Sequence, residues 1–253
     1  MGRQRRLTRA ELIVVIGSVL LALLTIGAAG ESARRLAHEL TCLSNTEVLT
    51  TAWLAYADDN DGRLVGGHTS DTPLQWVGQP AFDGRLDDKL DAIRRGLLFP
   101  YVGDLNAYHC PASQALNDPD YPLFRTYSIV GGANGEDWAE YNKARFYSDL
   151  ESPATRYIFV EEADPRGVNM GSWQMNPASL TWVDPLAMWH DEATTLGFAD
   201  GHAEVHRWHD RSLIEWCHRA MAKQGFTFNM TPPADEPNDV AFMAAGFPYK
   251  ALR

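Results

Sequence analysis

The sequence is poor in cysteine. Only three of its 253 residues are cysteines (Cys42, Cys110 and Cys217), and none stands in a CxxC pair. So few cysteines exclude a disulfide-rich scaffold, and their spacing lacks the pairing of a usual structural zinc site. Two states stay open: one disulfide with one free thiol, for which Cys42 and Cys110 are the candidate pair, or three reduced and buried cysteines.

Compact catalytic signatures are also lacking. The chain contains no GxSxG elbow, P-loop, dinucleotide fingerprint or HExxH pair, so we expect no enzymatic activity. It has no EF-hand pattern either. Calcium suits oxygen-rich groups such as Glu161, Glu162 and Asp164, which follow a predicted strand. We assign no calcium ligands and predict no cofactor.

Positive charge is scarce beyond the first 30 residues. Those residues carry four Arg and one Glu, which leaves 18 basic and 32 acidic residues for the rest of the chain. An acidic surface repels phosphate backbones, and no Lys/Arg stripe interleaved with aromatic residues is present. We therefore exclude nucleic acid as a partner.

One long apolar run stands near the N-terminus. The segment LIVVIGSVLLALLTIGAAG, residues 12–30, contains no charge. At 1.5 Å per residue it spans about 28 Å, which is enough to cross the hydrocarbon of a bilayer. Four Arg precede it and Glu31 follows, so the positive-inside bias predicts a single-pass inner-membrane protein with residues 1–11 in the cytoplasm. A cleaved secretory signal is the main alternative.

An amphipathic pattern continues beyond this run. Apolar residues recur every three or four positions, with Thr46 as the interruption: Leu36, Leu40, Leu43, Leu49, Trp53 and Tyr56. The spacing predicts one helix from about Thr8 to Asp58, which ends in the turn-forming residues 58–62. Residues 31–62 form the periplasmic part of this stalk, and residues 63–253 form an extracytoplasmic head.

The head shows the pattern of antiparallel strands. Residues 126–130 and 156–160 are β-branched or aromatic and are bounded by turn residues. Asp200-Gly201 predicts a two-residue turn between strands 196–199 and 202–208. Residues 211–224 predict a short helix, and the prolines at 232, 233 and 237 predict a loop. The expected fold is α+β: a long helix, transmembrane and then amphipathic, packed on an antiparallel sheet with long loops.

The segment RLTRAELIVVIG, residues 6–17, resembles the N-terminal motif of type IV prepilins. In that family a Gly precedes the cleavage point, an aromatic residue follows it, and a Glu stands five residues into the mature chain; these three positions fall on Arg6, Leu7 and Glu11. The resemblance implies that Glu11 pairs with the amino terminus of a neighbouring subunit in the membrane. The other interpretation of Glu11 is an interfacial residue that is solvated or paired with Arg9. Arg6 replaces the Gly, which leaves cleavage and methylation open.

A second set of motifs is similar to pilin-like proteins of planctomycete-type bacteria. It comprises CLSNTEVLTTAWLAYADDNDGRL at residues 42–64, Cys110-Pro111, and His190 followed after nine residues by Asp200-Gly201. We interpret Asp200-Gly201 as a structural turn, and we expect His190 to brace the start of that hairpin by hydrogen bonding.

Together these resemblances imply a pilin-like fold and a pseudopilin-like structural subunit of a type II secretion or type IV pilus-like system. Its expected partners are inner-membrane lipid, other pilin-like subunits, the secretion machinery and the prepilin peptidase.

A different class of function stays open as an alternative. His202, Glu204 and His206 alternate along a predicted strand and would share one face, which is compatible with a zinc site or a hydrolytic centre. The alternative is then a bitopic membrane protein with a metal-binding or hydrolytic head. A sugar- or protein-binding head is a third option, since eight Trp and nine Tyr offer stacking surfaces.

Overall fold

The computed structural model describes residues 9–81, 84–113, 124–166, 169 and 171–250. Within the first helix, the side chains at 9–15, 17 and 19–28 fall outside this description. Every structural statement below refers to the described residues.

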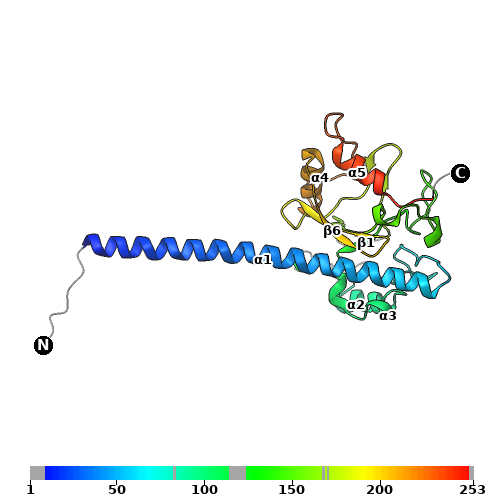
Figure 1. Cartoon of the computed structure of the whole chain (residues 1–253), viewed down its shortest axis with the longest axis horizontal. Coiled ribbons are helices and arrows are strands. Elements are labelled where there is room, and N and C mark those ends of the chain that lie inside the picture. The colour runs from blue at the N-terminus through cyan, green and yellow to red at the C-terminus, as the bar shows by residue number, and fades with distance from the viewer. Residues whose placement is uncertain (1–8, 82–83, 114–123, 167–168, 170, 251–253) are drawn as a thin grey trace.

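One helix, α1 (Arg9–Asp59), holds 51 residues and confirms the predicted long stalk. At 1.5 Å per residue it is about 77 Å long. Figure 1 shows its first half projecting beyond the head, while its last part runs through the head. The helix ends one residue later than expected. Asp61 and Gly62 adopt positive φ, and the amide of Gly62 donates to the carbonyl of Ala57 at 2.8 Å.

Among the residues that the structure describes, no helix carries an apolar stretch long enough to cross a membrane. The predicted spanning segment, residues 12–30, lies mostly where side chains are not described. The transmembrane assignment therefore stays a prediction.

The head is built on a four-stranded antiparallel sheet. Its strands are β1 (Tyr127–Ile129), β2 (Tyr157–Glu161), β5 (Ala193–Phe198) and β6 (Ala203–Arg207), in the order β1-β2-β5-β6. The strands expected at 126–130 and 156–160 are confirmed as β1 and β2. A separate ribbon pairs β3 (Met175–Asn176) with β4 (Thr181–Trp182). The α+β class, with α1 packed on the antiparallel sheet, is thus as expected.

The β5–β6 hairpin is present, but the predicted two-residue turn is wrong. Gly197 pairs with Ala203, and the amide of Phe198 donates to the carbonyl of His202 at 2.8 Å, so Ala199, Asp200 and Gly201 all belong to the loop. Gly201 has φ +102° and Asp200 does not have a positive φ. A three-residue loop with glycine in the positive-φ position explains why Gly is needed there and Asp is not.

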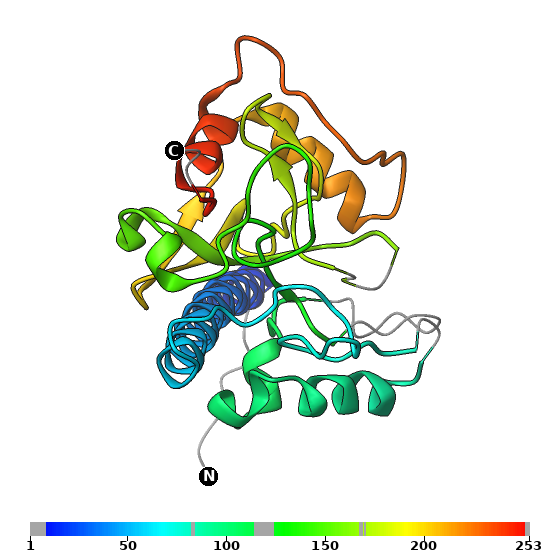
Figure 2. The ribbon, with the colours of Figure 1, turned by 90° about the vertical axis from the view of Figure 1, so that its right-hand side faces the viewer.

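The sheet packs on one side of α1, and the short helical elements α3 (Phe99–Val102) and η1 (Leu105–Tyr108) pack on the other. The remaining helical elements are α2 (Leu86–Arg95), α4 (Arg211–Met221) and α5 (Asn238–Gly246), with short 3-10 turns η3 (Tyr147–Asp149) and η4 (Pro153–Thr155). The helix expected at 211–224 is confirmed as the shorter α4, whereas α2 and α5 were not expected. Figure 2 shows α1 between the lobe that contains the sheet, α4 and α5 and the layer that contains α2 and α3.

The stalk helix enters the head at Cys42. Leu49 and Trp53 of the predicted apolar stripe are fully buried, but Leu36 and Leu40 are 56% and 55% exposed. The stripe therefore extends beyond the head instead of packing on it along its whole length. Thr46, which interrupts the stripe, is fully buried.

Small residues let α1 approach β5 closely. The hydroxyl of Thr46 lies 2.9 Å from that of Thr195, and it also donates to the carbonyl of Cys42 at 2.8 Å. A Cβ added to Gly197 would lie 2.5 Å from Oγ1 of Thr50 and 2.8 Å from Cγ2 of Thr46. The threonines keep their hydroxyls hydrogen-bonded, so burying them leaves no unsatisfied polar atom at this interface.

This packing predicts the effect of Gly197→Ala. The added methyl group would push α1 away from β5, so we expect the full-length protein to lose about 1–3 kcal/mol of unfolding free energy in denaturant titrations. Gly30→Ala is the matched control, because nothing lies within 4 Å of a Cβ at that position of α1. The control should lose no stability. Equal stability of Gly197→Ala and wild type would show that α1 and β5 do not pack this closely.

Candidate functional site

Four buried side chains from four separate segments converge beside α1. They are Cys42 of α1, Cys110 just after η1, Glu161 at the end of β2, and His190 before β5. One sulfur, nitrogen or oxygen atom of each lies within 4.8 Å of the others. In the described part of the chain, no other group of His, Cys, Asp or Glu gathers in this way.

The four side chains contact one another in sequence, from Cys42 through Cys110 and His190 to Glu161. Sγ of Cys42 lies 2.7 Å from Sγ of Cys110, and that sulfur lies 3.4 Å from Nε2 of His190. The same nitrogen lies 3.2 Å from Oε1 of Glu161. Both cysteines are free in this structure.

Neighbouring groups hold these side chains in place. Oε2 of Glu161 accepts a hydrogen bond from the amide of Thr195 in β5 at 2.8 Å. The amide of Cys110 donates to Oγ1 of Thr126 at 2.7 Å. The cluster is therefore held by the sheet as well as by Cys42 of the stalk helix. The second carboxylate oxygen of Glu161 already accepts a hydrogen bond.

The cluster shifts the protonation of its members. Burial raises the pKa of the Cys42 thiol, but hydrogen bonds from Cys110 and His190 outweigh burial, so the pKa of Cys42 lies below its ordinary value. Burial lowers the pKa of His190, yet hydrogen bonds to Cys42 and Glu161 outweigh it and raise this pKa to about 10. Burial raises the pKa of Cys110, as does its bond to Cys42.

The burial of the cluster limits its chemistry. Cys42, Cys110 and Glu161 are fully buried and His190 is 4% exposed, so a macromolecular or sugar substrate cannot reach the sulfurs in this conformation. A buried set of two sulfurs, one imidazole and one carboxylate can hold a metal ion, or its two sulfurs can form a disulfide. Cys217 is buried elsewhere and shares no contact with this set in the described structure.

His190 was expected to brace the start of the hairpin by hydrogen bonding. Its ring bonds to Glu161 on β2 and lies beside Cys110. The link to β5 runs through Glu161 and the amide of Thr195. The candidate disulfide partners, Cys42 and Cys110, do lie side by side.

The set formed by His202, Glu204 and His206 does not assemble as a metal-binding group in the described structure. Nδ1 of His202 lies 2.5 Å from Oδ1 of Asp200, and its ring stacks on Phe198. His206 stacks instead on Phe242 of α5 at 4.0 Å between ring centroids. Glu204 and His206 lie opposite Leu196 and Thr194 on β5, so the predicted alternation along the strand holds. The His202 and His206 rings nevertheless stack on different aromatic residues.

The processing and assembly motif cannot be placed. Arg6 and Leu7 lie outside the described residues, and the backbone of Glu11 is described without its side chain.

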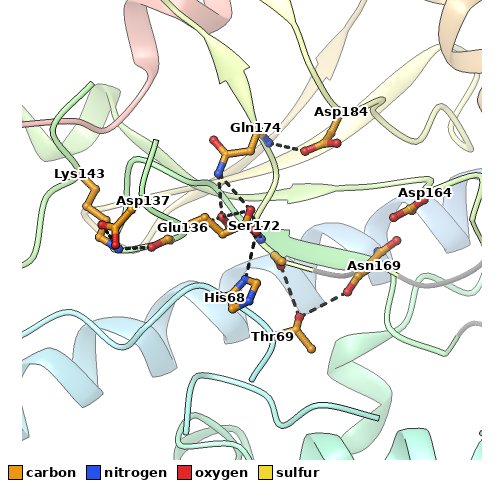
Figure 3. A network of polar contacts seen from close by, with 12 residues as sticks. His68, Thr69, Glu136, Asp137, Lys143, Asp164, Asn169, Ser172, Gln174 and Asp184 are labelled. Atoms are coloured by element: carbon orange, nitrogen blue, oxygen red, sulfur yellow. Dashed lines mark hydrogen bonds and ion pairs between the residues drawn. The ribbon is translucent and has the colours of Figure 1, made fainter. Parts of the chain in front are cut away.

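A second polar network lies beside the end of β1, where Trp173 pairs with Val130. Glu136 accepts from Ser172 and Gln174, each at 3.4 Å, and its Oε1 lies 3.4 Å from Nδ1 of His68. Figure 3 shows this cluster, in which the backbone amide of Gln174 also donates to the carboxylate of Asp184.

Arg125 is the buried cation of this region. It donates to the carbonyl of Tyr127 at 2.7 Å, to the hydroxyl of Ser128 at 2.9 Å and to Thr69 at 3.0 Å, and it also donates to the carbonyl of Asn169. Ser128 in turn donates to the carboxylate of Glu162.

The acidic group considered for calcium is thereby divided. Glu161 faces the cysteines, Glu162 accepts from Ser128, and Asp164 forms an ion pair with Arg166 at 2.5 Å. The alternation of β2 sends Glu161 and Glu162 to opposite faces.

No short sequence motif predicts the cluster of Cys42, Cys110, Glu161 and His190. Its members lie at positions 42, 110, 161 and 190 of the chain and meet only when α1 packs on the folded sheet. A usable signal was nevertheless present, because Cys42, Cys110 and His190 each stand in a segment with a family-like motif.

Comparisons of the chain with models of protein families, with curated proteins and with solved structures find no match.

The Arg125 network predicts a stability effect. Burial lowers the pKa of Arg125 to about 10, so the guanidinium is charged at neutral pH. Arg125→Met would leave the buried carbonyls of Tyr127 and Asn169 without this donor and would remove a positive charge near Glu162, so we expect a loss of about 3–5 kcal/mol of unfolding free energy near neutral pH. Arg211→Met, which removes an exposed ion pair with Glu215, is the control and should cost far less than Arg125→Met, because exposed ion pairs contribute little.

The loss should also depend on pH. Burial raises the pKa of Glu162 well above its ordinary value, and the charge of Arg125 opposes this shift. A carboxyl group whose pKa is raised by folding favours the folded state at low pH, and it loses that contribution as pH rises through the folded pKa. Denaturation of Arg125→Met should thus show a smaller loss at about pH 5 than at about pH 8. A loss independent of pH would contradict the proposed charge compensation.

Proposed function

We propose that this chain is a pseudopilin-like structural subunit of a type II secretion or type IV pilus-like system. The observation that carries the proposal is helix α1: 51 residues long, core of the head in its last part, and projecting from the head in its first half (Figure 1). A helix of this kind can bundle with identical helices while its head stays outside the bundle.

The exposed surface of α1 supports assembly through this helix. Leu36 and Leu40, one turn apart, leave more than half of their surface in solvent, and Val48 is 40% exposed. Apolar side chains on a stalk gain free energy when a neighbouring helix covers them. In the proposed fibre, the helices of adjacent subunits provide that cover.

Location in the inner membrane is part of the same proposal. Residues 12–30 would lie in lipid, with the basic segment 1–11 in the cytoplasm and the head in the periplasm. Glu11 would stand at the threshold of the hydrocarbon, where an unpaired carboxylate is costly. Pairing with the amino terminus of a neighbouring mature subunit would remove that cost.

The alternative of a hydrolytic head receives less support. The histidines on which it was based, His202 and His206, are engaged in separate stacking contacts. The Cys/His/Glu cluster favours only the metal-binding half of that alternative, because its atoms are buried from any substrate.

Site-specific cross-linking in native membranes tests the proposal. Leu36→Cys places one exposed thiol on the stalk, while the three native cysteines are buried. Oxidation of these membranes should give disulfide-linked dimers. Adding Glu11→Gln should reduce the dimer yield several-fold because the pairing charge is lost. Glu31→Gln, which changes a carboxylate on the same helix beyond the apolar run, should leave the yield unchanged.

The mature N-terminus is read from the same membranes by mass spectrometry. Processing by the prepilin pathway predicts a chain that begins at Leu7 with a methylated amino group. An absence of dimers, or dimers equally abundant in the Glu11→Gln variant, would contradict assembly through the stalk. A retained Met1 would contradict the pairing of Glu11 with a processed amino terminus.

A further inference from the structure

We propose that Cys42, Cys110, Glu161 and His190 bind one Zn²⁺ ion, and that this ion fastens the stalk helix to the head. The proposal goes beyond the role as a fibre subunit and does not depend on it. It rests on the convergence of the four buried donor groups described above.

The donor types fit zinc. Zn²⁺ takes thiolate sulfur, imidazole nitrogen and carboxylate oxygen, and its structural sites are four-coordinate and closed to solvent. Calcium and magnesium prefer oxygen ligands and do not suit two sulfurs. An iron–sulfur cluster is commonly held by four thiolates, and this site offers two.

The spacing is close to that of a tetrahedral site. With Zn–S of about 2.3 Å and Zn–N or Zn–O of about 2.1 Å, the ligand atoms stand apart by about 3.6 Å for sulfur to nitrogen and 3.4 Å for nitrogen to oxygen. The observed separations are 3.4 Å from Cys110 to His190 and 3.2 Å from His190 to Glu161. The two sulfurs, at 2.7 Å, must move apart by about 1 Å to reach the 3.8 Å that Zn–S bonds require.

A disulfide accounts for less of this arrangement. It would satisfy the two sulfurs but would leave the buried pair of Glu161 and His190 against an apolar bridge, with no reason for both to face it. A buried charged pair is costly unless further contacts compensate for it. A zinc ion engages all four groups at once, and the thiols and the imidazolium release their protons to solvent as the metal binds.

The surroundings resemble the outer shell of a structural metal site. Glu161 has its second oxygen fixed by the amide of Thr195, which orients the first oxygen toward the cluster. A shallow surface pocket lined by Arg35, Leu36, Asp191 and other residues adjoins His190 and offers an entry path. Outer-shell contacts such as the one between Thr195 and Glu161 orient ligands and raise metal affinity.

The position of the site suggests its role. Its ligands come from α1, from the segment after η1, from β2 and from the segment before β5. Cys42 is also where α1 enters the head, so a metal bond at this residue would resist peeling of the helix from the sheet. Nearby ion pairs from Arg35 to Asp191 and from Arg207 to Glu39 join the same helix to the head only at the exposed surface, where such pairs contribute little.

The test uses the full-length protein purified without reductant or chelator from the compartment in which it folds. We expect one zinc per chain by elemental analysis. After exchange with Co²⁺, we expect the near-ultraviolet charge-transfer absorption of thiolate-bound cobalt and the visible bands of a tetrahedral ion. Thermal unfolding should shift to higher temperature with zinc, since a ligand that binds the folded state stabilises it.

Variants assign the ligands. Cys42→Ser and Cys110→Ser should each lower zinc affinity by more than the ~10–100-fold that outer-shell changes cost. Glu161→Gln keeps the side-chain volume. It should weaken the binding of zinc but leave the charge-transfer absorption of thiolate-bound cobalt. Cys217→Ser and His202→Ala are controls outside the cluster and should retain one zinc per chain.

Two results would overturn the proposal, and both come from the wild-type protein, so they stand even where a serine variant does not fold. The first is a Cys42–Cys110 disulfide found by peptide mass mapping. The second is the absence of bound zinc or cobalt in protein whose two thiols are reduced and which has been supplied with the metal alone.

Discussion

The structure depends on the docking of one helix face into the head. From Cys42 to Trp53, α1 provides core residues to the domain it carries, lying between the β-sheet and the layer of α2 and α3 (Figure 2). The approach to β5 is close because Thr46 and Thr50 face a glycine, Gly197. A helix that supplies the core of the head cannot be exchanged or released without unfolding the domain, so stalk and head form one mechanical unit.

Most of the regular structure could be predicted from local pattern. The helix of α1 follows from a long stretch without proline, and β1 and β2 follow from β-branched and aromatic runs. The helices α2 and α5 were missed. For α2 a local signal was present, because its first turn carries two Asp and its last turn two Arg, as the helix dipole favours. The turn at Asp200 and Gly201 was placed correctly but counted one residue too short, since an Asp-Gly pair serves both two- and three-residue loops.

The candidate site was the part least accessible to sequence reasoning. His202, Glu204 and His206 are close in sequence and drew attention, yet the two rings stack on different partners, Phe198 and Phe242, and the three residues form no metal-binding group in the described structure. The cluster that does form joins residues as far apart as Cys42 and His190, and its proximity arises only from tertiary packing. Neither cysteine stands in a pair, so the usual spacing rule for zinc could not detect it. In the proposed fibre subunit, a metal ion at Cys42 would strengthen the attachment of the stalk helix to the head.

Hydrogen exchange of the full-length protein, followed by mass spectrometry, tests most directly whether stalk and head are one unit. Amides of residues 42–57 should exchange only through global unfolding, with the same free energy as the amides of β2 and β5. Exchange of this part of α1 at a faster rate than the sheet would show that the helix opens independently, and it would contradict the account.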